Sequence, residues 1–319
     1  MPSTYLQSIQ KDGFVVIPSL IPPSSKEFET LKQAAITATT KTRTGSWPYF
    51  RTVPKQFPPW PTNVPPPASE GGIWGVQHLL HPDMPGREDF ARFYFDDRVL
   101  GVVEELLGLD CAGEKGKNDD EMLVMELFNL LVAPETHDFA LRWHRDDIPE
   151  TVSRVEEEEL LASKSPGGRQ SHAQYNLALC DDASLIVVPG SHRRVRTETE
   201  RAADPYENDL SGQLVVELKA GDAVFYDSNI LHRGVYKANE EGGKESRLTL
   251  HGSVGIKETG EGEGDGSKKV RATAVLQHGV GAWVQRGDAA FGIGGRAEKM
   301  RANLVAMGTG EGVGYSLQG

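Results

Sequence analysis

Two histidines and one aspartate are spaced so that they could hold a transition metal. His144 and Asp146 stand two residues apart at the end of an apolar run, and His232 closes a second apolar run 88 residues further along. Side chains at positions i and i+2 of a strand point to the same face, so His144 and Asp146 can reach one ion. Two imidazoles and one carboxylate leave open positions on the metal, which suits the oxygen chemistry of non-haem Fe(II).

The short motif His-x-acid is weak when it is taken alone. Nine histidines and 46 acidic residues in 319 positions give about 1.3 occurrences by chance. The chain indeed contains a second example, His81-Pro-Asp83, whose central proline predicts a turn and not a paired strand. The pair at His144 is favoured because it ends an apolar strand and because His232 follows in another strand.

Arg247 is a candidate for binding a dicarboxylate cosubstrate. It begins the apolar run Arg247-Leu-Thr-Leu, with 14 residues between it and His232. A dicarboxylate that chelates iron at one end needs its far carboxylate neutralised, and a guanidinium can bind that group through two parallel hydrogen bonds. The alternative is a surface arginine in an ion pair.

The first 120 residues are predicted to form a layer of helices and loops. The pattern indicates a helix from Ser3 to Gly13, a strand at 14–17, a helix capped by Ser24 or Ser25, and a helix from Asp96 or Asp97 to Gly108. Residues 45–72 combine many prolines with aromatic side chains, which favours an ordered loop packed on the rest of the protein.

From residue 121 the sequence changes to short apolar runs separated by Gly, Pro and Asp. Runs of this kind with no helices between them predict an antiparallel sandwich or jelly roll. A helix containing Ala297, Met300, Leu304 and Met307 is predicted to close the fold, and residues 257–269 read as an exposed hairpin loop. The predicted strands are 123–132, 139–143, 175–179, 185–188, 214–218, 223–226, 231–236, 248–254 and 270–276.

Several other polar residues are candidates for contacts inside the fold. His172, Gln174 and Asn176 alternate along one strand, so they either face the cosubstrate and substrate or lie on an edge strand facing water. Trp74, Gln77 and His78 follow the proline-rich loop and could cover the pocket. We interpret the other groups as structural or solvated: His137, His251, His278, His192, an exposed helix at Glu156–Glu159, and a self-paired surface containing Arg193, Arg194, Arg196 and Arg201.

Composition excludes several classes of protein. A net charge of −12 argues against nucleic-acid binding. No run approaches the roughly 18 apolar residues that a membrane span needs, and the N-terminus lacks the apolar segment of a secretion signal. Cys111 and Cys180 cannot form a disulfide framework, and the C-terminal Ser-Leu-Gln-Gly is not a peroxisomal address. We therefore expect a cytoplasmic protein that acts on a small molecule; the sequence does not specify its oligomeric state.

Taken together, the motifs resemble the phytanoyl-CoA dioxygenase family, and in particular its fungal-type branch, which is associated with secondary metabolism. The resemblance runs over most of the chain and follows the order of the family's motifs. They are Asp12-Gly-Phe-Val-Val-Ile17, the helix Val99–Gly108, Trp143-His-Arg-Asp146, Val187-Val-Pro-Gly-Ser-His192, Ala220-Gly-Asp-Ala-Val-Phe225, His232 and Arg247.

This resemblance implies a mainly β, double-stranded β-helix (jelly-roll or cupin-like) fold in a single domain over residues 1–319. The N-terminal layer would span 1–120, the β-helix core 121–282, and a C-terminal helix and tail 283–319. It also implies Fe(II) held by His144, Asp146 and His232. 2-Oxoglutarate would chelate the iron, with Arg247 on its distal carboxylate and Gln174 and Thr249 as further contacts. Trp74, Gln77, His78 and Asn176 are the predicted substrate contacts.

The implied reaction uses O2, converts 2-oxoglutarate to succinate and CO2, and hydroxylates, desaturates or epoxidises a small metabolite, which we expect to be neutral and partly apolar. Two alternatives remain: a cupin-like metal enzyme that does not use 2-oxoglutarate, and a catalytically silent binding protein. The sequence also departs from the family. Gly234 replaces a small hydroxyl residue, Arg142 stands where some relatives have glutamine, and Asn239–Glu245 lengthens the interval before Arg247.

Overall fold

The computed structural model describes residues 4–58, 60–61, 63–109, 122–164, 170–238, 247–257 and 267–308. The helices are α1 (Thr4–Asp12), α2 (Lys26–Arg43), α3 (Arg87–Tyr94), α4 (Asp97–Leu107), α5 (Arg154–Lys164), α6 (Glu198–Ala202), α7 (Ser267–Gln277) and α8 (Gly295–Met307). The strands are β1 (Phe14–Ile17), β2 (Phe50–Thr52), β3 (Ile73–Val76), β4 (Leu123–Val132), β5 (Phe139–Ala140), β6 (His172–Ala178), β7 (Asp182–Val187), β8 (Leu214–Leu218), β9 (Ala223–Tyr226), β10 (His232–Tyr236) and β11 (Leu248–Ile256).

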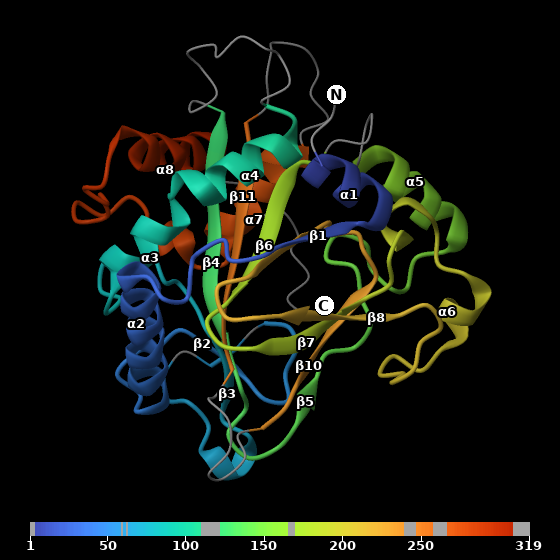
Figure 1. Ribbon diagram of the computed structural model, residues 1–319, viewed down its shortest axis with the longest axis horizontal. Coiled ribbons are helices and arrows are strands. Elements are labelled where there is room, and N and C mark those ends of the chain that lie inside the picture. Colours follow the sequence, from blue (N-terminus) through green and yellow to red (C-terminus); the bar gives the residue numbers. More distant parts are fainter. Residues whose placement is uncertain are drawn as a thin grey trace.

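Two antiparallel sheets make up the centre of the molecule (Figure 1). The larger sheet has the order β1-β9-β6-β11-β4-β3-β2, and the smaller sheet has the order β5-β10-β7-β8. After β4 the chain crosses repeatedly between the sheets, as from β4 to β5, from β6 to β7, and from β9 to β10. This is the jelly-roll arrangement that the sequence predicted, with helices flanking it.

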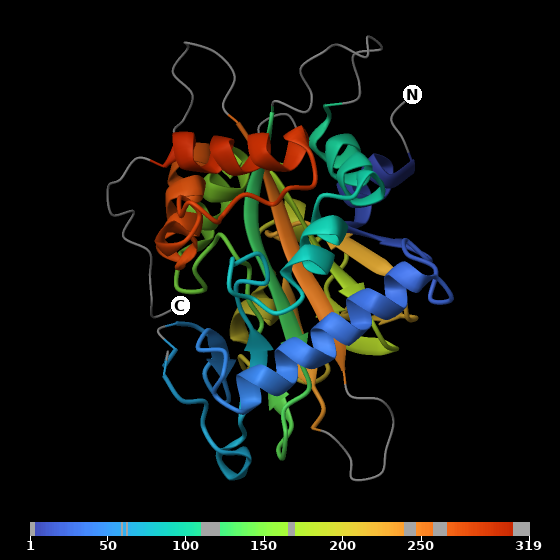
Figure 2. The same cartoon turned by 90° about the vertical axis from the view of Figure 1, so that its left-hand side faces the viewer.

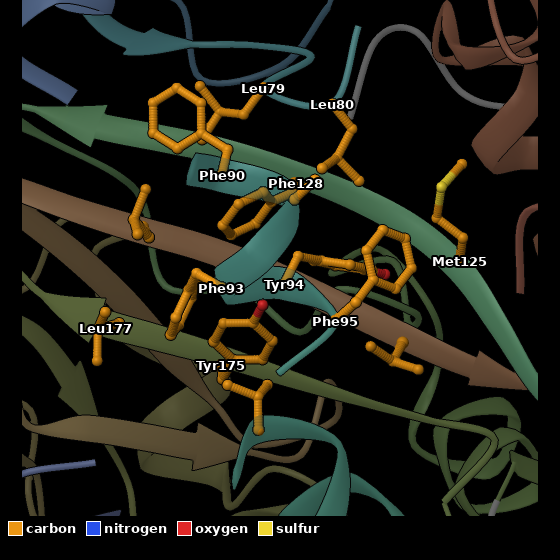
Figure 3. Close-up of a cluster of buried hydrophobic side chains, with 14 of the residues drawn as sticks. Leu79, Leu80, Phe90, Phe93, Tyr94, Phe95, Met125, Phe128, Tyr175 and Leu177 are labelled. Atoms are coloured by element: carbon orange, nitrogen blue, oxygen red, sulfur yellow. The ribbon is translucent and has the colours of Figure 1, made fainter. Parts of the chain in front are cut away.

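Helices cover the outer face of the larger sheet (Figure 2). α2, α4, α7 and α8 contact its strands, and α3 packs between α2 and α4. Beneath α3, the rings of Phe90, Phe93 and Tyr94 meet Phe128 of β4 and Tyr175 of β6, so that aromatic side chains fill the space between helix and sheet (Figure 3). Burying such side chains supplies much of the free energy that holds helix to sheet.

The N-terminal elements follow the predicted capping signals. Ser25 accepts a hydrogen bond from the amide of Phe28 at the start of α2, and Asp96 does the same for Arg98 at the start of α4. Gly108 ends α4 in the left-handed conformation, which glycine adopts without the steric cost of a side chain. No helix among the residues that the structure describes is long and apolar enough to cross a membrane.

The structure corrects several element predictions. Residues 270–276, predicted as a strand, belong to helix α7, where Ala272 and Val275 are buried three residues apart while Val270 is exposed. A short apolar run does not distinguish a helix from a strand. The predicted strand 139–143 is paired only at Phe139–Ala140, and the proline-rich segment contains strand β2.

Some predictions fall outside the described residues: most of the hairpin loop predicted at 257–269, the insertion at 239–245, Cys111 and the C-terminal tail after residue 308. Residues 267–269 of the predicted loop belong instead to helix α7. The helix predicted at Glu156–Glu159 is present in α5, but it is not uniformly exposed, because the side chain of Glu157 is fully buried. Its carboxylate pairs with Arg145, Arg196 and Arg201. The predicted self-paired arginine surface is therefore in part a buried ionic cluster.

Candidate metal centre

The backbone brings His144, Asp146 and His232 together at the edge of the smaller sheet. His144 and His232 exchange two backbone hydrogen bonds of 3.0 Å, and the amide of Asp146 donates to the carbonyl of Ser228 at 2.8 Å. One carboxylate oxygen of Asp146 lies 3.5 Å from Nε2 of His144 and 3.7 Å from Nε2 of His232. Among the described residues, this is the group of three possible ligands whose ligand atoms lie within 4.8 Å of one another.

Hydrogen bonds behind the three side chains orient them. Nδ1 of His144 faces the carbonyl of Arg142 at 2.8 Å, and Nδ1 of His232 faces the carbonyl of Ile230 at 2.9 Å. A hydrogen on each Nδ1 leaves each Nε2 lone pair available for a metal. The amide of Gln174 donates to the second oxygen of Asp146 at 2.8 Å, so Gln174 acts on the carboxylate from the inner face of β6.

The electrostatics keep two of the three possible ligands, His232 and Asp146, deprotonated at neutral pH. Burial, followed by the nearby ring of His144, lowers the pKa of His232 to about 4. Burial alone would raise the pKa of Asp146, but His232, His144 and Gln174 together hold it well below its usual range. A metal must displace protons from its ligands to bind. Here few protons compete, so the donor set fits a divalent first-row ion such as Fe(II).

The second His-x-acid motif has a different role. His81 and Asp83 lie in a turn, where Nδ1 of His81 accepts a hydrogen bond from the amide of Asp83 at 3.0 Å. The His81 ring is buried against Trp47 and Trp283. It is a packed structural residue, and the turn that its central proline predicts is confirmed.

A cavity adjoins the triad, and Arg247 lines it. The guanidinium donates from Nε to Asp182 at 2.9 Å and lies 4.4 Å from the ring centre of Tyr236. Its Nη1 is buried and has no hydrogen-bond partner among the described residues. Because a buried unpaired donor is costly, this nitrogen is suited to an anionic group in the cavity.

Thr249 contributes to the cavity indirectly. Its hydroxyl donates to Asp182, the same carboxylate that holds Arg247. Ser184 also donates to Asp182, at 2.5 Å. Thr249 thus helps fix the arginine through Asp182, whereas the sequence predicted a direct contact with the cosubstrate.

The position of Tyr236 explains why glycine, and not a small hydroxyl residue, stands at position 234. A Cβ atom at Gly234 would stand 2.2 Å from the Tyr236 hydroxyl, so the tyrosine fills the space that a larger residue would need. Both residues line the cavity, because positions two apart on β10 face the same way. The sequence analysis missed Tyr236; its spacing from Gly234 was the available signal.

The remaining predicted residues divide between the cavity and its surroundings. Trp74 and Asn176 line the cavity, and Nδ1 of His251, which also lines it, lies 2.9 Å from the Asn176 side-chain oxygen. His251 is therefore placed at the cavity, although we had interpreted it as structural. Gln77 and His78 are not among the lining residues. His78 is buried edge-on against the ring of Tyr49.

Two further arginines can now be located. Arg142 pairs with Glu150 at 2.7 Å and stacks on Phe57, outside the cavity lining. Arg51 of β2 lines the cavity, with its guanidinium 5.0 Å from the Trp74 ring and 5.4 Å from the Trp60 ring. The sequence analysis did not single out Arg51, because its position depends on the pairing of β2 with β3.

Comparisons with known proteins agree with this geometry. The model of the phytanoyl-CoA dioxygenase family matches residues 9–239. No curated protein sequence matches the chain. Among solved structures, EctD from S. alaskensis with 2-oxoglutarate and 5-hydroxyectoine has a TM-score of 0.52 at 17% identity, covering 80% of this chain and 76% of EctD. HygX from Streptomyces hygroscopicus with nickel and 2-oxoglutarate has a TM-score of 0.52 at 18% identity, covering 80% and 87%. At these identities the likeness establishes the fold.

Proposed function

The chain belongs to the phytanoyl-CoA dioxygenase family and is a 2-oxoglutarate-dependent non-haem iron oxygenase, and we propose that His144, Asp146 and His232 hold its iron. Iron bound there would activate O2 as 2-oxoglutarate is converted to succinate and CO2, and would direct the oxidation to the substrate. The observation that carries this assignment is the cavity that joins the three ligands to Arg247.

The cavity has suitable groups at both ends for a dicarboxylate. One carboxylate and the adjacent keto oxygen of 2-oxoglutarate would bind beside the triad. The other carboxylate would accept hydrogen bonds from Nη1 of Arg247, with Tyr236 stacked on the guanidinium. Asp182 and Thr249 would hold the arginine, and Gln174 would orient Asp146. Trp74 and Asn176 would form further walls of the cavity.

We propose a small organic metabolite as the substrate, with hydroxylation, desaturation or epoxidation as the outcome. Membership of the fungal-type branch, a role in secondary metabolism and a cytoplasmic location belong to the same proposal, as does a single oxygenase domain. They are supported by sequence features alone: the order of the family's motifs along the chain and the small number of cysteines.

The test is to incubate the enzyme with Fe(II), 2-oxoglutarate, O2 and a metabolite extract, and to measure succinate together with masses shifted by +16 or −2. Succinate that increases with the extract and one shifted product supports the proposal. A metal-dependent product without succinate would instead indicate the cupin-like enzyme. That alternative has one observation in its favour, since Arg247 already pairs with Asp182. If neither a product nor succinate forms, the result would indicate a binding protein.

A further inference from the structure

Arg51 of β2 brings a second guanidinium to the cavity beside the triad. β2 lies at the edge of the larger sheet, where it pairs with β3, and β3 pairs with β4. Arg51 stands opposite Gly75 of β3, and Gly75 stands opposite Leu131 of β4, which also lines the cavity. Side chains of directly opposite residues lie on the same face of an antiparallel sheet, so Arg51 is on the face that borders the cavity.

Gly75 gives the Arg51 side chain a path over β3. A Cβ atom at Gly75 would stand 3.1 Å from Cδ and 3.3 Å from Cγ of Arg51. The stem of the arginine therefore rests against the glycine backbone. Because glycine has no side chain, a residue of the edge strand can reach across its neighbour and place its guanidinium at the cavity.

Two tryptophan rings hold this guanidinium. It lies 5.0 Å from the ring centre of Trp74 and 5.4 Å from that of Trp60. The indole of Trp74 donates to the carbonyls of Thr52 at 3.1 Å and Lys55 at 3.0 Å, and the indole of Trp60 donates to the same Lys55 carbonyl at 3.2 Å. Stacking uses the flat face of a guanidinium and not the N–H groups at its edge. The rings thus orient the cation without neutralising its charge.

The charge of Arg51 acts on other groups that line the cavity. Burial, followed by the charge of Arg51, lowers the pKa of His251 to about 3. Burial raises the pKa of Tyr236, and the charges of Arg247 and Arg51 oppose that rise. His251 and Tyr236 both belong to the cavity lining. The positive field of Arg51 is therefore directed into the same cavity that adjoins the triad.

Arg51 and Arg247 are held at different places on the cavity wall. The rings of Trp74 and Tyr236 stack on each other with their centres 5.7 Å apart. Arg51 contacts the Trp74 ring of this pair, and Arg247 contacts the Tyr236 ring. Arg247 also pairs with Asp182 at 2.9 Å, and its remaining donor is assigned to the cosubstrate. We therefore expect Arg51 to meet a different anionic group.

The remaining lining suits a partly apolar molecule. Leu131, Leu141 and Leu185 supply aliphatic walls. Asn176 and His251 form a polar pair, with 2.9 Å between the Asn176 side-chain oxygen and Nδ1 of His251. Together with Arg51, the lining combines apolar surface with one further positive charge.

We propose that Arg51 binds a carboxylate of the substrate, which makes the substrate a small carboxylic acid with an apolar body. This proposal rests on the proposed oxygenase function and refines its substrate class from a neutral molecule to a monoanion. A guanidinium matches the planar carboxylate and can bind it through two parallel hydrogen bonds. 2-Oxoglutarate is itself a dicarboxylate, so the test must separate substrate from cosubstrate.

The test uses three probes with one carbon skeleton: cyclohexanecarboxylate, cyclohexanecarboxamide and cyclohexylmethylamine. Their dissociation constants are measured by calorimetry on the full chain, loaded anaerobically with Fe(II) and saturating 2-oxoglutarate, so that the cosubstrate already occupies its own site. We expect the carboxylate to bind at least about tenfold more tightly than the neutral amide, because its hydrogen bonds to Arg51 are charge-assisted. The amine should bind most weakly.

Arg51→Gln should remove most of the preference for the carboxylate and leave the affinities for the amide and for 2-oxoglutarate unchanged. Arg51→Lys keeps the charge but not the planar fork, so it should retain a reduced preference, and it replaces Arg51→Gln if that variant does not fold. Arg92→Gln is the matched control, because it removes the same charge from an exposed position on α3. It should bind all three probes like the wild type.

Three results would overturn the proposal. The first is the absence of a carboxylate preference in the wild type. The second is a preference that Arg51→Gln or Arg51→Lys leaves unchanged, which would show that the carboxylate binds elsewhere, such as at the metal. The third is weaker 2-oxoglutarate binding in Arg51→Gln with an unchanged probe preference, which would assign Arg51 to the cosubstrate.

Succinate release by the same preparations separates this inference from the proposed function. Succinate formation without a carboxylate preference would overturn the acid site alone. A clear carboxylate preference in a protein that never forms succinate would instead overturn the oxygenase function on which the proposal rests.

Discussion

In the cavity beside the triad, the side chain of Arg247 is only 10% exposed, and its buried Nη1 has no hydrogen-bond partner in the part of the chain that the structure describes. Replacing it with alanine should weaken 2-oxoglutarate by roughly 30-fold to several thousand-fold, since truncating one partner of a buried charge pair costs about 2–5 kcal/mol. Iron affinity should change little. The measurement is a 2-oxoglutarate titration of the anaerobic Fe(II) protein, followed by its visible charge-transfer band.

Arg142→Ala is the matched control for that experiment, because Arg142 pairs with Glu150 outside the cavity lining. It should bind 2-oxoglutarate like the wild type. An unchanged dissociation constant in Arg247→Ala would contradict the assignment. Arg51, which lines the same cavity, would then be the next candidate for the carboxylate site.

Tyr236 is predicted to support the cosubstrate as well. Tyr236→Phe keeps the ring over Arg247 and removes only the hydroxyl that crowds Gly234. Loss of one hydrogen-bonding group costs about 0.5–1.5 kcal/mol, so the dissociation constant for 2-oxoglutarate should rise roughly 2- to 10-fold. Thr136→Val, which alters a hydroxyl in the exposed loop after β4, should have no such effect. If Tyr236→Phe and the wild type bind 2-oxoglutarate with equal affinity, the Tyr236 hydroxyl has no role in binding the cosubstrate.

At the level of the elements, an ion pair joins α5 directly to the metal-binding segment. Glu157 of this helix is fully buried and bonds Arg145, the residue between the ligands His144 and Asp146. Arg145 also donates to the carbonyls of Ser191 and Arg194, both at 2.9 Å. The ion pair therefore joins the helix, the metal-binding segment and the turn after β7.

Glu157→Ala should lower the free energy of unfolding by about 3–5 kcal/mol, because it leaves buried arginines unpaired. Urea denaturation provides the measurement. Glu158→Ala, one residue further along the same helix but exposed, should change stability by no more than about 0.5 kcal/mol. Similar stabilities for the two variants would show that the buried cluster contributes little.

These elements also show how far the sequence could predict the fold. Helices with local signals, such as α4 between Asp96 and Gly108, were predicted well, because caps act within a few residues. α7 was predicted as a strand because its apolar run is too short to distinguish a helix from a strand. The burial of Glu157 depends on Arg145, Arg196 and Arg201 meeting it from other segments, so its local pattern of acids indicated only an exposed face.

The candidate site likewise contains residues that the local sequence could predict and residues that it could not. His144, Asp146 and His232 could be predicted because strand periodicity and residue chemistry restrict them. Tyr236 and Arg51 enter the cavity through strand register, which the local sequence did not specify.

For the whole molecule, buried neutral histidines predict acid sensitivity. Burial is the main cause that lowers the pKa of His78 to about 3 and the pKa values of His172 and His192 to about 4. Unfolded chains bind these protons near pH 6.5. As pH falls from about 6.5 towards 4, the unfolded state gains protons that the folded state excludes, and each histidine lowers stability by up to about 1.4 kcal/mol per pH unit.

Urea unfolding of the metal-free protein at pH 7.5, 6 and 5 measures this effect. His172→Gln should make the decline with pH shallower, whereas His137→Ala, at an exposed position, should leave the decline unchanged. A free energy of unfolding that stays constant between pH 7.5 and 5 would contradict the prediction.

The central claim is that His144, Asp146 and His232 hold iron, and Fe(II) binding by His232→Ala beside His81→Ala tests it most directly. Both variants lose one buried histidine, but only the first loses a ligand of the triad. After anaerobic loading and desalting, we predict one Fe(II) per chain with the 2-oxoglutarate charge-transfer band in wild type and His81→Ala, and neither in folded His232→Ala. Full iron retention and an unchanged band in His232→Ala would contradict the account.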